Sequence, residues 1–486
     1  RICRALDPTP SFMNRNGLVR RFCLRTAGLR AASLAGLIAF PLLAQALEPP
    51  RAPGPEAGPA SLLTVYIEAL QRNAEYRAQL AATRAVTELD RAMAGKLLPQ
   101  LGLGASYDYV FENLEGDYYS LPNVDSRENF ARGIVGLKLT QALYQPELWI
   151  SRDQSELRLN QSRFELEKAE DQLLLDVVGA YFGVLAAQDA WRLTQAESLA
   201  VERQLEQVRI RGQAGLALEA EVLAAAAQRS IAYANLIQAE SRIDTARSAL
   251  DLAAGMRFRD LKTLPEEDMP LERPEPADPQ SWIARAREQN LDVVQARLSS
   301  QLAQLEAEKA RSARLPRVDA VGSASYLDLD GGVSGARTEE DARIGVNLNL
   351  PLYTGGSVTA AIGAADAAVD RAAALVEAAQ GRAERDTRVA FFALLNSLNK
   401  VPARADAVRA ARASEDATVA GYAAGTRTNA EVLRAVEDRY DAERTYSAAR
   451  YDYMLDSLRL KFSAGLLVNG DLSRFDRILR AANSAH

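Results

Sequence analysis

Hydrophobic and polar side chains alternate along the segment that begins at Leu101. Large or apolar residues share one face and small or polar residues take the other: Leu101, Leu103, Ala105, Tyr107, Tyr109 and Phe111 against Gly102, Gly104, Ser106 and Asp108. The same period recurs at Val135, Leu137 and Leu139. A period of two is that of a β-strand with two unlike faces. We therefore predict a hairpin whose acidic, glycine-bearing surface loop covers residues 112–129.

A second hairpin is predicted further along the chain. Its return strand is regular, with Ile344, Val346, Leu348 and Leu350 alternating with Gly345, Asn347 and Asn349. The alternation is less regular in its outgoing strand. One face there has Val318, Ala320, Ala324 and Tyr326, the other has Asp319, Ser323 and Ser325, and the pattern is interrupted at Val321 and Leu327. We expect its loop, again acidic and glycine-bearing, over residues 328–342.

Strands of about 10 residues with one apolar face are what a transmembrane β-barrel requires. A solvated hairpin packed on a core is the alternative, but the lack of a partner sheet favours the barrel, as does the N-terminal export signal described below (residues 13–46). Four strands cannot close a barrel alone, and an open edge has no hydrogen-bonding partner in lipid. Two chains would give eight strands and a filled interior, whereas three would give twelve strands and a lumen. A conducting barrel therefore requires at least a trimer.

Long helical segments follow each predicted hairpin. Residues 146–212 and 354–421 carry an apolar stripe of coiled-coil type, and each segment would be about 100 Å long. The first ends before Gly215, and a return helix is predicted from Glu219 to Gly255. A helix over residues 62–95 precedes the first hairpin. We expect antiparallel helical hairpins that project from the barrel.

The two halves of the chain repeat each other at a shift of 210 residues. The shift superposes Gly215 on Gly425, Gly255 on Gly465, and residues 220–223 on 430–433. We therefore predict an internal duplication, in which each half reads helix, two strands, long helix, helix. The predicted boundaries are a leader (1–46), a proline-rich lead (47–60), a first repeat (61–255), a proline-rich linker (256–280), a second repeat (281–465) and a tail (466–486).

The N-terminal segment has the features of a secretory signal peptide. A basic stretch after Met13 is followed by an apolar run over residues 31–43 and by the small residues Ala44 and Ala46. This pattern predicts cleavage after Ala46. An uncleaved membrane anchor is the alternative, but an apolar run of this length is shorter than the about 20 residues that span a bilayer. The mature chain is thus expected to leave the cytoplasm.

Composition excludes most enzyme classes. The single histidine is His486, and the two cysteines, Cys3 and Cys23, lie in the leader. Histidine-dependent catalysis, a catalytic thiol and a histidine-ligated metal site are therefore not expected, and neither is a cofactor. The chain without residues 1–46 has a net charge of −12, which disfavours nucleic-acid binding.

Around the second glycine turn the chain resembles the TolC family of outer-membrane channel-tunnels. The resemblance rests on the motif Gly421-Tyr422-Ala423-Ala424-Gly425-Thr426-Arg427-Thr428 with Val432-Leu433, and on its echo Gly215-Leu216 with Glu221-Val222. It covers about residues 62–466 and includes the repeat and the strand order. It implies an α+β membrane protein: a homotrimer with a twelve-stranded barrel in the outer membrane and a long periplasmic helical tunnel, in which the 256–280 linker lies at the equator.

The resemblance also implies a gate at the periplasmic ends of the helical hairpins. The tips, marked by Gly215, Leu216, Gly425 and Thr426, would narrow the tunnel and dock a periplasmic adaptor. In the family, a tyrosine and an arginine hold the closed tip by polar links to the neighbouring first-half hairpin. Those positions are Tyr422 and Arg427, with Glu221 as the acidic partner; Ala220 replaces the family's threonine, so one link is missing.

Of the two negative charges that line the pore in the family, this chain has only one. Two aspartates one turn apart are expected there, and the corresponding residues are Glu431, which keeps the charge, and Arg434, which reverses it. Three arginines beside three glutamates would offset the field that attracts cations. Strong cation selectivity is therefore not expected.

The function implied is passive export in a tripartite type I secretion system. An adaptor would connect the duct to an inner-membrane ABC transporter, and the cargo would be a protein toxin of the haemolysin or adenylate cyclase class. The chain contains no GxxxxGK[ST] phosphate loop, consistent with energy supplied by a partner. A small-molecule efflux duct of the same family and a periplasmic coiled-coil scaffold are the alternatives, and a carboxylate-based enzyme has no supporting motif.

Overall fold

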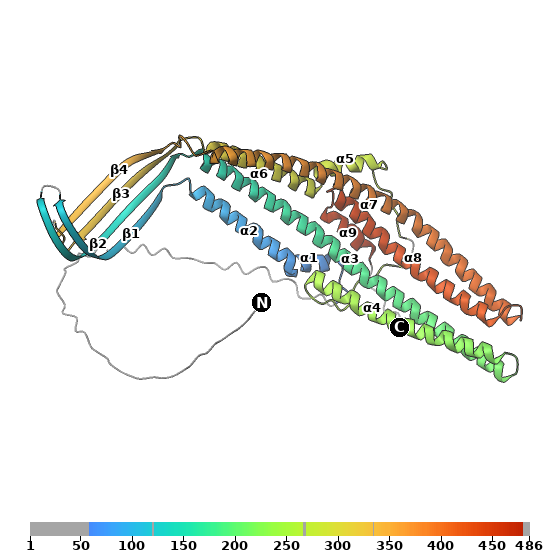
Figure 1. Ribbon diagram of the computed structural model, residues 1–486. Helices are drawn as coiled ribbons and strands as arrows, with labels where there is room; N and C mark the ends of the chain where they lie inside the picture. Colours follow the sequence, from blue (N-terminus) through green and yellow to red (C-terminus); the bar gives the residue numbers. More distant parts are fainter. Residues whose placement is uncertain (1–57, 119–120, 266–268, 334, 480–486) are drawn as a thin grey trace, which may run out of the picture. The chain divides into compact units, whose positions relative to one another are not determined.

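The fold joins two β-hairpins to long helices. The computed structural model describes residues 58–118, 121–265, 269–333 and 335–479. In chain order the elements are α1 (Leu62–Arg72), α2 (Ala74–Gly95), β1 (Gln100–Tyr118), β2 (Leu121–Tyr144), α3 (Pro146–Gln213), α4 (Glu219–Ala254), α5 (Pro279–Gln289), α6 (Leu291–Ser312), β3 (Arg317–Leu329), β4 (Arg337–Asn349), α7 (Ser357–Ala423), α8 (Asn429–Ser463) and α9 (Asn469–Ile478) (Figure 1). All lie within the unit Pro55–His486. The predicted leader, with Ala44 and Ala46, lies outside the described residues.

Both predicted hairpins are present, and they form one antiparallel sheet in the order β1-β2-β3-β4. Its register aligns the apolar positions of all four strands, so that Leu103, Leu137, Ala324 and Ala342 lie in one row. These side chains are not covered by another element: Leu103 is 72% exposed and Ile344 is 96% exposed. Within the described residues the sheet therefore presents an exposed face on which apolar side chains predominate.

The predicted hairpin loops were too long. In the first hairpin Glu112 pairs with Glu128 and Glu115 with Asp125, so most of the expected 112–129 loop is strand. In the second, β3 continues to Leu329 and β4 starts at Arg337. The reason is that a β-ladder is held by backbone hydrogen bonds, which continue past the apolar positions once the strands are in register.

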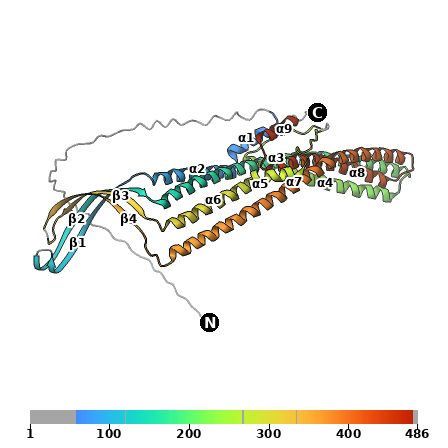
Figure 2. The same cartoon turned by 90° about the horizontal axis from the view of Figure 1, so that it is seen from above.

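The long helices run close to the predicted bounds. α3 extends over Pro146–Gln213 and α7 over Ser357–Ala423, and each returns through α4 or α8. α6 runs alongside α7 (Figure 2). α3 is long and apolar enough to cross a membrane by length and composition. However, three residues of this helix, Val177, Tyr181 and Phe182, are only 0–1% exposed and belong to the core cluster, so we interpret it as a core helix.

The helix predicted over residues 62–95 is in fact two helices that meet at Asn73. The Asn73 side chain accepts a hydrogen bond from the Tyr76 backbone N–H and donates one to the Ala253 carbonyl oxygen (3.0 Å). The second half has the same break at Asn290, whose Nδ2 donates to the Ser463 carbonyl oxygen (2.9 Å). Asparagine competes with the helix for backbone hydrogen bonds, and here it docks each break onto the end of a return helix.

The core lies where these breaks meet the long helices. Tyr181 donates its hydroxyl to the carbonyl oxygens of Ala60 (3.0 Å) and Lys262 (2.8 Å), which ties the start of the described chain to the linker. The predicted tail contributes α9, whose Leu472 and Phe475 are buried in the same cluster. The region near the linker is thus a packed centre from which the two helical hairpins extend.

Candidate functional site

The turn between α7 and α8 is a compact backbone cap. The Gly421 carbonyl oxygen accepts hydrogen bonds from the backbone N–H groups of Thr426 (2.8 Å) and Arg427 (3.3 Å). Gly425 has a φ of 77°, a left-handed conformation that only glycine adopts without strain. The turn therefore has the 6→1 bond and the left-handed residue of a helix C-terminal cap.

The turn between α3 and α4 lies 210 positions earlier in the sequence and has the same backbone conformation. The Arg211 carbonyl oxygen accepts from the Leu216 N–H (2.8 Å), and Gly215 has a φ of 74°. The four predicted tip residues, Gly215, Leu216, Gly425 and Thr426, all lie in these turns. The two hairpins thus end in equivalent loops.

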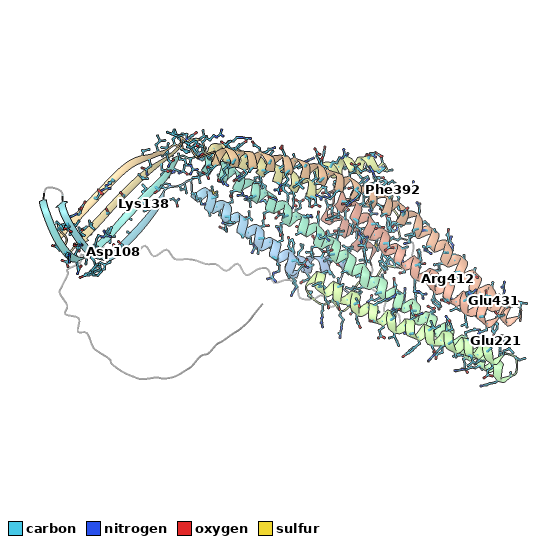
Figure 3. The ribbon with its side chains drawn as sticks, in the orientation of Figure 1. Asp108, Lys138, Glu221, Phe392, Arg412 and Glu431 are labelled. Carbon is cyan, nitrogen blue, oxygen red and sulfur yellow. The ribbon has the colours of Figure 1, made fainter. Side chains whose placement is uncertain are left out.

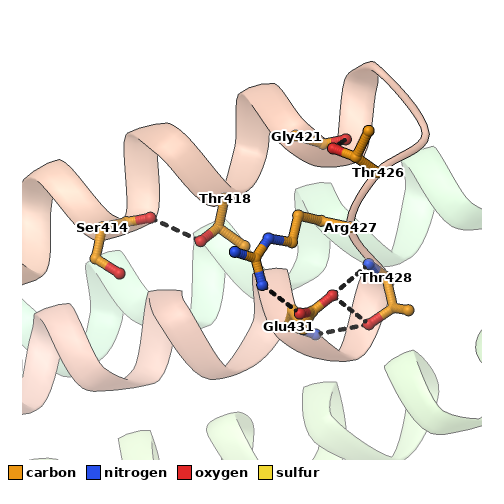
Figure 4. A network of polar contacts seen from close by, with 7 residues as sticks. All are labelled: Ser414, Thr418, Gly421, Thr426, Arg427, Thr428 and Glu431. Atoms are coloured by element: carbon orange, nitrogen blue, oxygen red, sulfur yellow. Dashed lines mark hydrogen bonds and ion pairs between the residues drawn. The ribbon is translucent and has the colours of Figure 1, made fainter.

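The helices that leave the two turns start differently. α8 starts with a capping box, in which the Glu431 N–H donates to Thr428 Oγ1 (3.3 Å) and the Thr428 N–H donates to Glu431 Oε2 (2.7 Å) (Figure 4). α4 starts after Leu218, which has no hydroxyl group and makes no side-chain cap. Two reciprocal hydrogen bonds between Thr428 and Glu431 therefore stabilise the first turn of α8, whereas the first turn of α4 has no side-chain cap.

Arg427 is paired within its own hairpin. Its Nη1 lies 2.7 Å from Glu431 Oε1, and the two side chains are 57% and 41% exposed. The stem of Arg427 crosses Gly421 so closely that a Cβ there would lie 2.7 Å from Arg427 Cγ. Hydrogen bonds from the Thr428 backbone and from Arg427 lower the pKa of Glu431 to about 2, so its carboxylate is charged at neutral pH.

Glu221, the predicted partner of Arg427, lies on the other hairpin (Figure 3). Within the described chain it makes no ion pair, and its helix position corresponds to that of Glu431. Its predicted link to Arg427 stays a prediction.

Tyr422 and Arg434 have different surroundings. The guanidinium carbon of Arg211 on α3 lies 4.5 Å from the centroid of the Tyr422 ring, so this tyrosine contacts the first hairpin by stacking. Arg434 is exposed one turn after Glu431, and no ion pair involves it among the described residues. The structure thus brings Arg427 and Glu431 together, and packs Tyr422 of α7 against Arg211 of α3.

One contact near the tip was not predicted from the sequence. Gln204 of α3 and Asn429 of α8 form a buried amide–amide hydrogen bond. A pattern could have indicated it: Asn429 starts the apolar stripe Val432, Val436 and Tyr440, so a polar residue occupies a core position. The described residues contain no group of three or more acidic, histidine or cysteine side chains suited to a metal ion.

Comparison with known proteins relates most of the described chain to one family. The family model described as outer membrane efflux protein matches residues 65–256 and 282–466. The outer membrane protein TolC of Salmonella enteritidis is 31% identical over 419 residues, which cover 85% of this chain and 83% of TolC. The alkaline protease secretion protein AprF of Pseudomonas aeruginosa is 26% identical over 422 residues, 85% of each chain. The structure of the outer membrane protein VceC from Vibrio cholerae matches with a TM-score of 0.71 over 83% of this chain and 96% of VceC, at 18% identity.

Proposed function

This chain belongs to the outer membrane efflux protein family, and from that premise we propose that three copies form one export duct. As a TolC-family protein it is a non-enzymatic outer-membrane efflux or secretion channel. The observation that carries the proposal is the sheet: in the described part of the chain β1 and β4 each pair with one strand, and one face is largely apolar and exposed. Three such sheets, joined edge to edge, would make a closed twelve-stranded barrel with its apolar face toward lipid.

The duct carries a protein in a tripartite type I secretion system. A periplasmic adaptor connects it to an inner-membrane ABC transporter, which supplies the energy. The likeness to AprF, whose name states alkaline protease secretion, supports a protein cargo; a toxin of the haemolysin or adenylate cyclase class is our specific proposal. The efflux description of the family model favours small-molecule efflux as the second candidate.

The adaptor docks on the tips of the helical hairpins. Leu216 and Leu218 on the first tip are 76% and 70% exposed, which is unusual for two leucines so close in sequence. The second tip presents the exposed residues Gly425 and Thr426 instead. We assign apolar docking to the first tip and polar docking to the second.

The same tips form the gate. Three copies of Glu431 and Arg434 lie around the narrow end of the tunnel, where the arginines offset the carboxylates. Tyr422 and Arg427 link each second hairpin to a first hairpin, with Glu221 as the acidic acceptor. In the closed state Arg427 then lies between two carboxylates, one from its own helix and one across the gap.

The assembly is tested by native mass. Protein extracted from isolated outer membranes in mild detergent is expected to have the mass of three mature chains after correction for bound detergent. A monomer released by buffer alone would mean that the strands fold without a membrane, and the duct would have to be abandoned.

Replacement of Arg427 by serine is expected to raise the basal conductance of the channel in planar bilayers. The variant removes the tip cation that we link to Glu221 of a first hairpin, and exposed ion pairs of this kind are weak. We therefore expect an increase on the order of two- to fivefold from the three copies together, and a smaller one at high salt. The control is Arg409→Ser, which removes an exposed arginine that pairs with Asp406 on α7. Equal conductance of Arg427→Ser and wild type, in assembled trimers, would exclude the role in closure.

A further inference from the structure

A groove lies between α2 and α6, over α3, in the part of the helical region nearest the sheet (Figure 1). Its volume is about 630 Å³, which is within the range of sites that hold small organic ligands. α2 leads into β1, α3 follows β2, and α6 leads into β3, so the groove lies just beyond the ends of these strands. One chain contributes all of its lining residues, and the groove therefore exists without a second copy.

One wall of the groove is apolar. Val86, Leu89 and Met93 follow one another on α2 at spacings of three and four residues, so they share one side of that helix. Leu148 of α3 lines the groove as well. Leu89 is 66% exposed, although it belongs to the middle of a helix. The groove therefore offers an accessible apolar surface to a ligand.

The groove also contains basic side chains from all three helical segments. Lys96 directly follows α2, Arg158 belongs to α3, and Lys309 belongs to α6. Among the described residues none of these three side chains forms an ion pair. The lining has one carboxylate, Glu147, and Arg317 already pairs with it. Like charges along one groove repel each other, so a bound anion would relieve this repulsion.

The groove lies on the side of α3 that is opposite to the apolar face of the sheet. Trp149 packs edge-on against Tyr144, with 5.3 Å between the ring centroids. Tyr144 pairs with Val318, in the row that contains the exposed Leu348 of the apolar face. At about 100° per helical residue, Ser151 in the groove lies about 200° around α3 from Trp149. In the proposed trimer, where the apolar face contacts lipid, the groove thus opens into the tunnel.

We propose that this groove is a binding site for small organic anions that combine an apolar body with one anionic group. Lys96, Arg158 and Lys309 hold the anionic group, and the apolar wall on α2 contacts the body. The position of the site on the tunnel wall rests on the proposed function, whereas the groove itself is formed within one chain. Molecules of this class bind there on their way from the helical tunnel to the barrel.

The site is tested by isothermal titration calorimetry with naphthalene-2-sulfonate, which joins an apolar ring system to one negative charge. The probe is titrated into detergent-extracted protein, and the titration into detergent alone is subtracted. We expect the wild type to bind it. Lys309→Gln and Arg158→Gln each remove one charge and keep a polar side chain, and each is expected to weaken binding about tenfold.

The matched control variant is Lys138→Gln. Lys138 pairs in register with Gly102 and Ser323 on the small and polar face of the sheet, and it does not line the groove (Figure 3). The control removes a lysine from the same side of the protein, and is expected to leave the affinity for naphthalene-2-sulfonate unchanged. If it weakened binding as much as Lys309→Gln, a diffuse positive field would explain the affinity, and the groove would not be the site.

Two further probes test the two halves of the ligand class. Methanesulfonate has the charged group without the rings, and is expected to bind at least about tenfold more weakly because it makes no contact with Leu89 or Met93. 1-Naphthylmethylammonium has the rings with the opposite charge, and is not expected to bind. Equal affinity of either probe and naphthalene-2-sulfonate would overturn the proposal.

Native mass distinguishes this proposal from the proposed function. A wild-type trimer that does not bind naphthalene-2-sulfonate would show that the binding site is wrong, and the duct would remain. Binding to wild-type protein that is not a trimer would support the groove and overturn the duct, together with the position of the groove on a tunnel wall.

Discussion

Replacement of Gly465 by alanine is expected to prevent stable folding of the region where the two halves of the protein meet. Gly465 follows α8 with a φ of 68°, and a Cβ there would lie 2.3 Å from the Gln289 carbonyl oxygen and 2.6 Å from its carbonyl carbon. Both atoms are backbone, so no side chain can rotate away. Strain in the left-handed region and the forced separation of α8 from the Asn290 break together cost about 2–6 kcal/mol.

The expected result is a large loss of assembled protein and a lower melting temperature of what remains, measured on detergent-extracted material. Gly255→Ala probes the corresponding position of the first half, where a Cβ would lie 2.8 Å from the Arg72 backbone; a smaller loss is expected. Gly381→Ala is the control, because Gly381 lies inside α7 with no atom within 4 Å of the added Cβ. It should be neutral or slightly stabilising. A Gly465→Ala protein that melts like the control would contradict this account.

The regular elements could be predicted because each depends on a short stretch of sequence. The period of two from Leu101 identified the faces of β1, and the glycines at 215 and 425 identified the ends of α3 and α7. The breaks at Asn73 and Asn290 could not be predicted in this way. Their side chains donate to carbonyl groups 180 and 173 residues away, so the break depends on tertiary packing.

The tip of the second hairpin contains contacts that the sequence did not indicate. Arg427 lies four residues before Glu431, a spacing at which helical side chains meet, and within the chain the structure pairs them. The family resemblance gave Glu221 as the acidic partner of Arg427, and the ion pair with Glu431 was not predicted. The Gln204–Asn429 bond joins residues 225 positions apart, and a pattern of apolar positions shows only that each amide lies on a buried face.

Among the described residues no element covers the exposed apolar face of the sheet, and the membrane prediction depends on this face. On one face Leu137 lies in the row with Leu103 and Ala324. On the other face Ser325 lies in the row with Gly136 and Asp341. Leu137 and Ser325 occupy adjacent strands at nearly the same height, so they offer a matched comparison of the two faces.

Leu137→Arg is expected to prevent insertion of the barrel, whereas Ser325→Arg is expected to be tolerated. An arginine at the middle of the lipid-facing surface costs ~2–4 kcal/mol in each chain, and a symmetric trimer incurs this cost three times. In the proposed barrel an arginine at 325 would face the lumen, where water would solvate it and Asp341 of the next strand would pair with it. The measurement is the amount of detergent-extractable trimer in isolated outer membranes.

If the face that contains Leu137 were packed on another protein surface in solution, Leu137→Arg would release soluble protein or leave the yield unchanged. If both faces were solvated, the two variants would behave alike. Only a barrel with lipid on one side and water on the other predicts loss at 137 together with tolerance at 325.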